Sequence, residues 1–230
     1  MQTLIRYKAI GLAALAILFA SCALLPTNYG GAPIEGLVID ARTKKPLEGV
    51  IVVQYWELRR PTVLGHSNFA GVLHIDETKT DSQGRYAFRR WGPMVAPVGT
   101  IVDSNSPSIR YFRPGYLPRG ESNYLPEAYE AHALSSALRS DWSGKTIGLD
   151  SVDNRLDEYE NRLISQDVRF ASMYRETCDW LKIPMMIGMV HKEKERLRQL
   201  GISSSITDID QLSARSTCGD VKAILKEYLE

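Results

Sequence analysis

Short runs of apolar, β-branched and aromatic residues recur between residues 34 and 149, and polar turns separate them. This pattern predicts strands at Gly36–Asp40, Val50–Trp56, Glu77–Thr80, Arg85–Phe88, Ser108–Phe112 and Lys145–Leu149. Residues 50–56 are apolar or aromatic at almost every position, which predicts a strand that is buried on both faces. Repeated short strands between turns are typical of an antiparallel β-sandwich.

The segments between these strands differ in length. Asp81–Gly84 predicts a hairpin loop between its flanking strands, with Gly84 at the position that needs a positive φ. Residues 61–73, 92–107 and 119–143 predict long loops, and the last two hold many of the Pro, Gly, Ser and Asn residues. Pro126–Leu138, within the last loop, is rich in Ala, Glu and Leu and is compatible with a short helix.

The spacing of apolar residues changes near Ser151, where steps of three and four begin. This spacing predicts a helix of roughly 30 residues from Val152 to Leu181, stopped by Pro184. A second helix is predicted from Met185 to Leu200, a short one begins near Thr207, and Cys218–Leu229 closes the chain. The fold class is therefore predicted to be α+β, with a β-sandwich over residues 34–150 followed by a C-terminal α-helical unit over residues 151–230.

The N-terminus has the pattern of a targeting segment. Arg6 and Lys8 precede 11 consecutive apolar or Gly residues, Ala9–Phe19, and the small residues Ala20 and Ser21 follow. These are the parts of a secretory signal, and the apolar run is shorter than the roughly 20 residues of a membrane-spanning helix. Residues 1–21 are predicted to be a signal peptide, and residues 22–33, which contain little periodicity, a tether.

Cys22, directly after two small residues, resembles the lipobox cysteine of bacterial lipoproteins, although Phe19 stands where Leu is usual. The resemblance implies that Cys22 is lipidated and becomes the N-terminus of the mature chain. Ala23 is not the Asp that often retains lipoproteins in the inner membrane, so the implied location is the bacterial cell envelope, at the outer membrane facing the periplasm. Plain secretion and an uncleaved anchor are the alternatives.

Charge and cysteine content fit an exported chain. Without residues 1–21 the chain keeps 26 basic and 27 acidic residues, a balance that gives no electrostatic reason to expect a nucleic-acid partner. If Cys22 carries lipid, Cys178 and Cys218 remain as a pair in an oxidising compartment, and we expect a disulfide between them. Two buried free thiols are the alternative.

A second resemblance lies within the predicted sandwich, in five stretches of sequence: Gly36–Asp40, Thr43, Pro46–Val52, Thr80–Phe88 and Gly115–Tyr116. They are similar to the carboxypeptidase regulatory-like domain over about residues 34–116. The resemblance implies an antiparallel prealbumin-like (transthyretin-like) β-sandwich. It also implies an accessory or adhesive module with no catalytic residue and no cofactor.

Histidines are the remaining candidates for chemistry. His66, His74 and Asp76 are spaced so that a metal site is conceivable, although surface polar residues are far more common in such a segment. The sequence therefore favours a non-catalytic envelope lipoprotein that binds or scaffolds, held to the membrane by its lipid and facing an envelope protein or glycan partner. The alternatives are a metal-dependent envelope enzyme that uses His66 and His74, and a soluble secreted carrier of small ligands.

Overall fold

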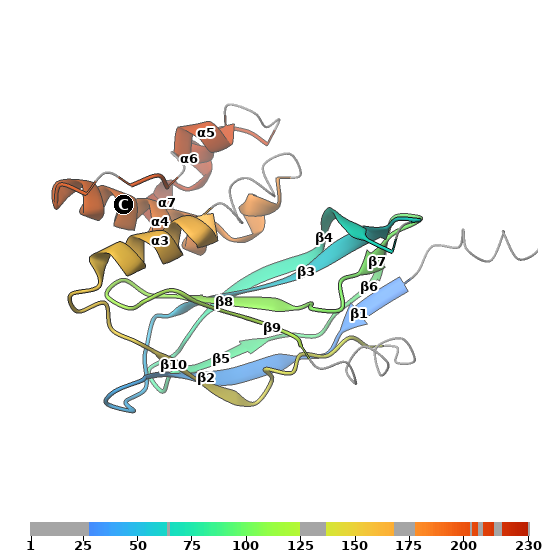
Figure 1. Ribbon diagram of the computed structural model, residues 1–230, viewed down its shortest axis with the longest axis horizontal. Helices are drawn as coiled ribbons and strands as arrows, with labels where there is room; N and C mark the ends of the chain where they lie inside the picture. Colours follow the sequence, from blue (N-terminus) through green and yellow to red (C-terminus); the bar gives the residue numbers. More distant parts are fainter. Residues whose placement is uncertain are drawn as a thin grey trace, which may run out of the picture.

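The computed structural model describes residues 28–63, 65–124, 137–167, 178–202, 204–206, 209–213 and 218–229. The signal peptide, Cys22 and most of the helix considered at residues 126–138 lie outside these ranges. Figure 1 shows a β-sandwich with helices packed on one outer face. Among the residues described, no helix is long and apolar enough to cross a membrane.

Strands make up most of the chain up to residue 149. They are β1 (Asn28–Gly31), β2 (Ile34–Asp40), β3 (Ile51–Pro61), β4 (Ser67–Lys79), β5 (Arg85–Phe88), β6 (Trp91–Val95), β7 (Ile101–Val102), β8 (Ser108–Phe112), β9 (Arg119–Ser122) and β10 (Lys145–Leu149). The helical unit follows, with α3 (Leu156–Asp167), the 3₁₀ turn η2 (Asp179–Lys182), α4 (Pro184–Gln199), α5 (Ile209–Ser213), α6 (Val221–Ile224) and α7 (Lys226–Leu229). The predicted order of a sandwich followed by helices is confirmed.

Two sheets form the sandwich. One has the strand order β10-β2-β5, and the other has the order β4-β3-β8-β9, with β7 paired to the far end of β3. A separate two-stranded sheet of β1 and β6 lies at one end (Figure 1). All pairs are antiparallel except β10 with β2, which are parallel. The expectation of a purely antiparallel sandwich is therefore wrong for β10, because the chain returns from β9 to the far side of β2 in the same direction.

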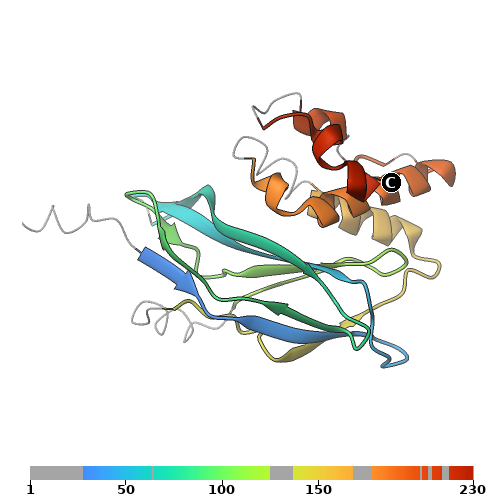
Figure 2. The ribbon, with the colours of Figure 1, turned by 180° about the vertical axis from the view of Figure 1, so that it is seen from behind.

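Strand β3 has both of its faces in apolar cores, as its composition predicts. Ile51, Val53 and Tyr55 belong to the core that is shared with the helices, whereas Val52 and Trp56 belong to the core between the two sheets. Figure 2 shows the same arrangement from behind, with the helices against the β4-β3-β8-β9 sheet and the β10-β2-β5 sheet on the opposite side.

Several predicted loops contain strands. β3 and β4 form a long antiparallel pair, so among the described residues of the loop predicted at 61–73 only 62, 63, 65 and 66 lie outside a strand. β7 and all but the first residue of β6 lie inside the loop predicted at 92–107, β9 lies inside 119–143, and β1 lies inside the predicted tether. The sequence did not predict these strands because they are short or polar. They form because their backbones pair with neighbours that are distant in sequence.

The turn at Asp81–Gly84 is tight, but it does not close a hairpin. Asp81 Oδ1 accepts hydrogen bonds from the backbone N–H groups of Gln83 (2.9 Å) and Arg85 (2.8 Å). The strands on its two sides belong to different sheets, because β4 pairs with β3 and β5 pairs with β2. The turn therefore carries the chain across the sandwich, and the predicted hairpin is wrong.

Glu77 of β4 joins the sandwich to the helical unit. Its two carboxylate oxygens accept hydrogen bonds from the backbone N–H groups of Met185 (2.7 Å) and Met186 (2.9 Å) in the first turn of α4. Ile183 at the N-cap provides no side-chain cap, so an acid from the sheet satisfies N–H groups that the helix itself leaves open. Pro184 is the first residue of α4, a position where its missing N–H costs nothing.

The long helix predicted over residues 152–181 is wrong at both ends. Val152 still belongs to a turn, where its N–H donates to the carbonyl of Gly115 at 2.9 Å, and α3 begins at Leu156. Cys178 has a left-handed φ of 58°, and η2 follows it, so no α-helix continues to Leu181. The second predicted helix is confirmed as α4, whereas the last apolar segment forms two short helices that meet at Leu225.

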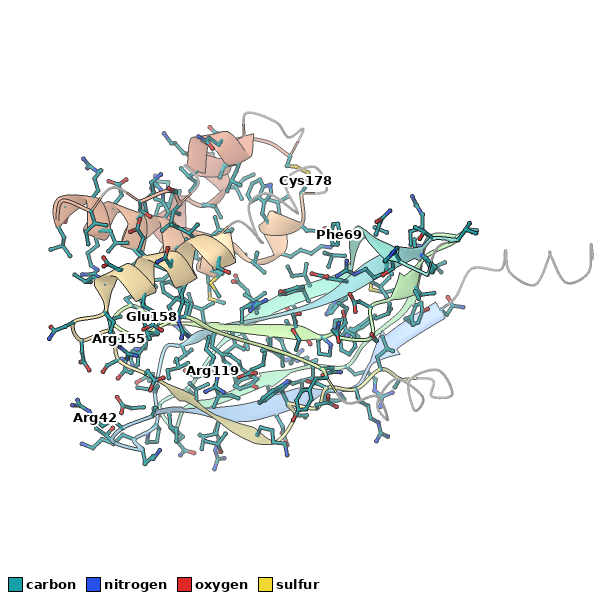
Figure 3. All side chains as sticks on the ribbon, viewed as in Figure 1. Arg42, Phe69, Arg119, Arg155, Glu158 and Cys178 are labelled. Atoms are coloured by element: carbon teal, nitrogen blue, oxygen red, sulfur yellow. A yellow bond between two sulfur atoms is a disulfide. The ribbon has the colours of Figure 1, made fainter. Side chains whose placement is uncertain are left out.

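The expected disulfide is present. Cys178 and Cys218 are bonded, with their Cα atoms 5.6 Å apart, and the bond joins the turn before η2 to the segment before α6 (Figure 3). It closes a loop over a sequence separation of 40 residues within the helical unit.

Gly84 and Gly49 give a matched test of the turn that crosses the sandwich. Both have left-handed backbones, with φ values of 74° and 77°. A Cβ at Gly84 would lie 2.4 Å from the carbonyl oxygen of Val38, whereas a Cβ at Gly49 meets nothing within 4 Å. We expect Gly49→Ala to lower the free energy of unfolding by about 1 kcal/mol, and Gly84→Ala by about 1–3 kcal/mol more. Urea denaturation of both variants measures the difference. Equal losses would show that the Val38 carbonyl does not confine Gly84.

Candidate functional site

The β10-β2-β5 sheet presents a groove with a volume of about 560 Å³. β2, β5 and the start of β10 line it, together with the chain between β4 and β5. In Figures 1 and 2 the helices lie on the opposite side of the sandwich, beyond the β4-β3-β8-β9 sheet. This groove was not anticipated from the sequence, because its residues come from four segments whose pairing only the fold reveals.

Strand register sets the floor and one rim of the groove. Leu37 is opposite Arg85, and Glu35 is opposite Ala87, so these four side chains share one face of the sheet. Arg85, Ala87 and Glu35 are exposed, and Leu37 is half-buried. The floor is thus apolar and narrow, and charged side chains stand beside it.

Most of the charged side chains around the groove have no hydrogen-bond or ion-pair partner among the described residues. Within the described part of the chain, the side chains of Glu35, Lys79, Arg85 and Lys145 make no hydrogen bond or ion pair. Asp81 also lines the groove, but its carboxylate holds the turn that precedes β5. Three cations and two carboxylates, Glu35 and Asp81, therefore surround an apolar floor, and this net positive arrangement suits a ligand with negative groups at several positions.

The two histidines of the metal hypothesis are far apart. His66 is an exposed residue of the turn before β4, and His74 lies eight residues further along the extended strand, roughly 25 Å away at the rise of a strand. Two side chains at this separation cannot bind one ion. Among the residues described, no group of three or more His, Cys, Asp or Glu side chains is placed to hold a metal.

His74 has a packing environment instead. Its ring stacks on Trp91 of β6, with centroids 4.6 Å apart, and the Trp91 ring meets Trp56 edge-on at 5.5 Å. Burial lowers the pKa of His74 to about 4, and the positive charge of Lys182 acts in the same direction. The imidazole is therefore neutral at neutral pH and serves as an aromatic contact between β4 and β6.

Gln54 is a second polar residue in this region that the sequence pattern did not single out. It is 1% exposed, and neither atom of its amide has a hydrogen-bond partner in the described part of the structure. Gln54 is opposite Asp76 on β4, and burial raises the pKa of the Asp76 carboxyl. A polar residue inside an otherwise apolar strand was the available signal.

Several polar residues that carry the family resemblance build turns. Asp40 Oδ1 accepts the backbone N–H groups of Arg42 (2.9 Å) and Thr43 (2.6 Å), and the hydroxyl of Tyr116 donates to Asp40 Oδ2 (3.1 Å). The Thr43 N–H contributes most to lowering the pKa of the Asp40 carboxyl. Buried Thr80 donates to the Leu47 carbonyl at 2.6 Å and thereby holds a second turn. These side chains hold the fold together and are not among the residues that line the groove.

No protein-family model matches the chain, and no curated protein is similar to it in sequence. Solved structures with partial similarity include a streptococcal ancillary pilin (TM-score 0.25, 12% identity, 56% of this chain and 30% of the pilin). The group B streptococcus pilus 2b backbone protein gives a TM-score of 0.28 at 15% identity over 53% of this chain and 41% of that protein. The 3-chlorocatechol 1,2-dioxygenase of Rhodococcus opacus 1CP gives 0.28 at 14% identity over 55% of this chain and 62% of the enzyme. The chain thus spans less than half the length of either pilin, and at these scores none of the three bears on function.

Two half-buried side chains, His74 and Glu77, are expected to give the stability of the protein opposite pH dependences. The folded pKa of His74 is about 4 and its ordinary value is 6.5, so its stabilising contribution is present above pH 6.5 and is lost as the pH falls through 4. Burial raises the pKa of Glu77 from 4.5 to about 7, against the opposing effect of the Met185 and Met186 N–H groups. Its contribution is therefore present below pH 4.5 and is lost as the pH rises through 7.

In the intact protein the contributions of His74 and Glu77 change the free energy of unfolding in opposite directions as the pH rises. Variants at each residue separate the two contributions. Between pH values of about 5 and about 7, we expect the unfolding free energy of His74→Phe to fall with rising pH by up to about 1 kcal/mol per unit, and that of Glu77→Gln to rise by a similar amount. The unsubstituted protein stays nearly flat over that range. Urea denaturation across the range measures all three, with His66→Phe at an exposed position as control. Identical profiles for all four proteins would contradict both assignments.

Proposed function

We propose that this protein is a non-catalytic lipoprotein of the bacterial cell envelope that binds or scaffolds an acidic partner through the groove on its β10-β2-β5 sheet. The observation that carries the proposal is the set of uncommitted charges around a narrow apolar floor on a rigid sheet. The prealbumin-like, carboxypeptidase regulatory-like motif supports it, because that family serves as an accessory or adhesive module. The lipobox-like Cys22 supports a location at the outer membrane, facing the periplasm.

The charges of the groove indicate the chemical class of the partner. Lys79, Arg85 and Lys145 outnumber the two carboxylates that line the groove, Glu35 and Asp81, so an envelope protein segment or glycan that carries carboxylates fits the groove better than a neutral one. Each cation is exposed, and a single exposed ion pair contributes little. Binding therefore needs several contacts along an extended ligand, which a groove over three strands provides.

Photo-crosslinking from the groove tests this proposal in cells. With p-benzoylphenylalanine at Ala87 of the full chain, we expect a discrete adduct in the envelope. Lys79→Gln, Arg85→Gln and Lys145→Gln together should reduce it by about tenfold, as expected when several weak ion pairs are lost.

A matched triple variant at the β2–β3 turn, with Arg42→Gln, Lys44→Asn and Lys45→Gln, removes the same charge away from the groove and should leave the adduct unchanged. An adduct that both triple variants reduce equally reflects net charge alone and contradicts a groove-specific site. The absence of any adduct contradicts it as well.

Mass spectrometry of membrane-extracted protein tests the anchor. We expect a mature chain that begins at Cys22 and carries acyl chains, and we expect Cys22→Ser to abolish acylation and release the protein from the membrane fraction. Ala23→Ser, a neighbouring change, should preserve both. A chain cleaved elsewhere and free of lipid would instead support the soluble secreted carrier.

A further inference from the structure

Exposed apolar side chains concentrate in one part of the fold. Five of the nine large apolar residues that are exposed in the described structure come from residues 63–101: Val63 (104% exposed), Phe69 (37%), Val95 (61%), Val98 (52%) and Ile101 (40%). We call these five residues the apolar tip. Scattered exposed apolar residues are normal, whereas a contiguous group of them usually marks a contact surface.

Backbone pairing places two residues of the apolar tip on either side of β3, and the chain connections place two more beside them. Arg59 of β3 is opposite Phe69 on one side and opposite Ile101 on the other, so these two apolar side chains flank the end of β3. Val63 lies in the turn beyond that end, and Val98 lies in the loop that leads to Ile101. Figure 1 shows β7 and the turn between β3 and β4 at one end of the sandwich, and Figure 3 shows Phe69 there.

The first described residue lies at the same end. Asn28, where β1 begins, is directly opposite Val95 of the apolar tip. Asn28 is six residues after Cys22, and an extended chain of that length reaches at most about 20 Å. If Cys22 carries lipid, as proposed above, this end of the sandwich must therefore lie close to the bilayer surface.

We propose that the apolar tip inserts into the interfacial region of the bilayer that holds the lipid of Cys22. The inference rests on the proposed lipidation and adds to it an orientation of the sandwich relative to the bilayer. The short connection keeps the tip at a high effective concentration next to the membrane, so weak insertion of a few side chains is enough to hold it there. Arg60, exposed beside the tip, lies at the level of the headgroup phosphates in this orientation.

A fluorescent reporter in the tip measures insertion. Once Cys22 is acylated and the Cys178–Cys218 disulfide has formed, a Cys introduced by Val98→Cys is the single free thiol and takes an NBD label. Ile224→Cys provides a matched control, because Ile224 is an apolar residue of the helical unit with 40% exposure. The full acylated protein is reconstituted in vesicles of phosphatidylethanolamine and phosphatidylglycerol, with and without lipids brominated near the headgroup.

We expect the brominated lipids to quench NBD at position 98 by at least about twofold and to leave NBD at position 224 unchanged. Adding Phe69→Asp to the Val98→Cys protein should abolish that quenching, because an ionised carboxyl resists the interface. Acylation should stay the same. Because Phe69 is only 37% exposed, Val63→Asp at a fully exposed turn position repeats the test and should leave the thermal unfolding midpoint unchanged.

The outcomes separate the orientation from the anchor. Acylated protein that floats with vesicles but gives no quenching at position 98 overturns the inference and leaves the lipoprotein proposal intact. Protein without acyl chains overturns the lipoprotein proposal, whatever the reporter shows. An NBD blue shift that appears without vesicles and grows with protein concentration means that a second copy of the chain covers the tip, and this also overturns membrane insertion.

Discussion

The structure depends on one strand that belongs to two cores. β3 places Val52 and Trp56 between the sheets and Ile51, Val53 and Tyr55 under the helices, and each of these side chains is at most 2% exposed. Because side chains alternate along a strand, a register slip of one residue in β3 would exchange the two sets and disrupt both cores at once. The two-sided burial therefore fixes the register of the sheet and the position of the helical unit together.

Polar contacts then specify how the helical unit sits on this strand. Glu77 is on the edge strand beside β3 and satisfies two N–H groups of α4, while Trp180 and Tyr159 are fully buried in the core that the sheet shares with the helices. Apolar packing alone is tolerant of rotation, whereas a carboxylate that accepts two backbone donors requires one direction of approach. The disulfide acts within the helical unit and makes no link to the sandwich, so the docking relies on the core and on polar contacts such as those of Glu77 and the hydrogen bond from Arg162 of α3 to the Pro118 carbonyl (3.2 Å).

Structural features that depend on one segment of the chain could be predicted from the sequence, whereas features that depend on pairing between distant segments could not. The centres of β2, β3, β5, β8 and β10 and the helix α4 were predictable, because apolar runs and helical spacing are visible in a single segment. The cysteine pair was predictable because Cys178 and Cys218 are the two cysteines that remain once Cys22 is assigned to lipid. The parallel pairing of β10, the crossing at Asp81–Gly84 and the strands β1, β6, β7 and β9 were not, since backbone partners from distant segments decide them. The groove was missed for the same reason, and the histidine hypothesis failed because an extended strand separates residues that are only eight apart in sequence.

The proposed anchor and the proposed binding groove make different demands, and the fold can meet both. A protein held by a lipid at Cys22 must keep its ligand surface clear of the bilayer, yet β1 begins only six residues later. The groove lies toward the turn between β4 and β5, whereas the apolar tip lies at the turn between β3 and β4, at the other end of β4. A 13-residue strand, roughly 40 Å long, separates the two turns. With the tip in the interface, the length of β4 would hold the groove and the helical unit out in the periplasm, without a long flexible tether.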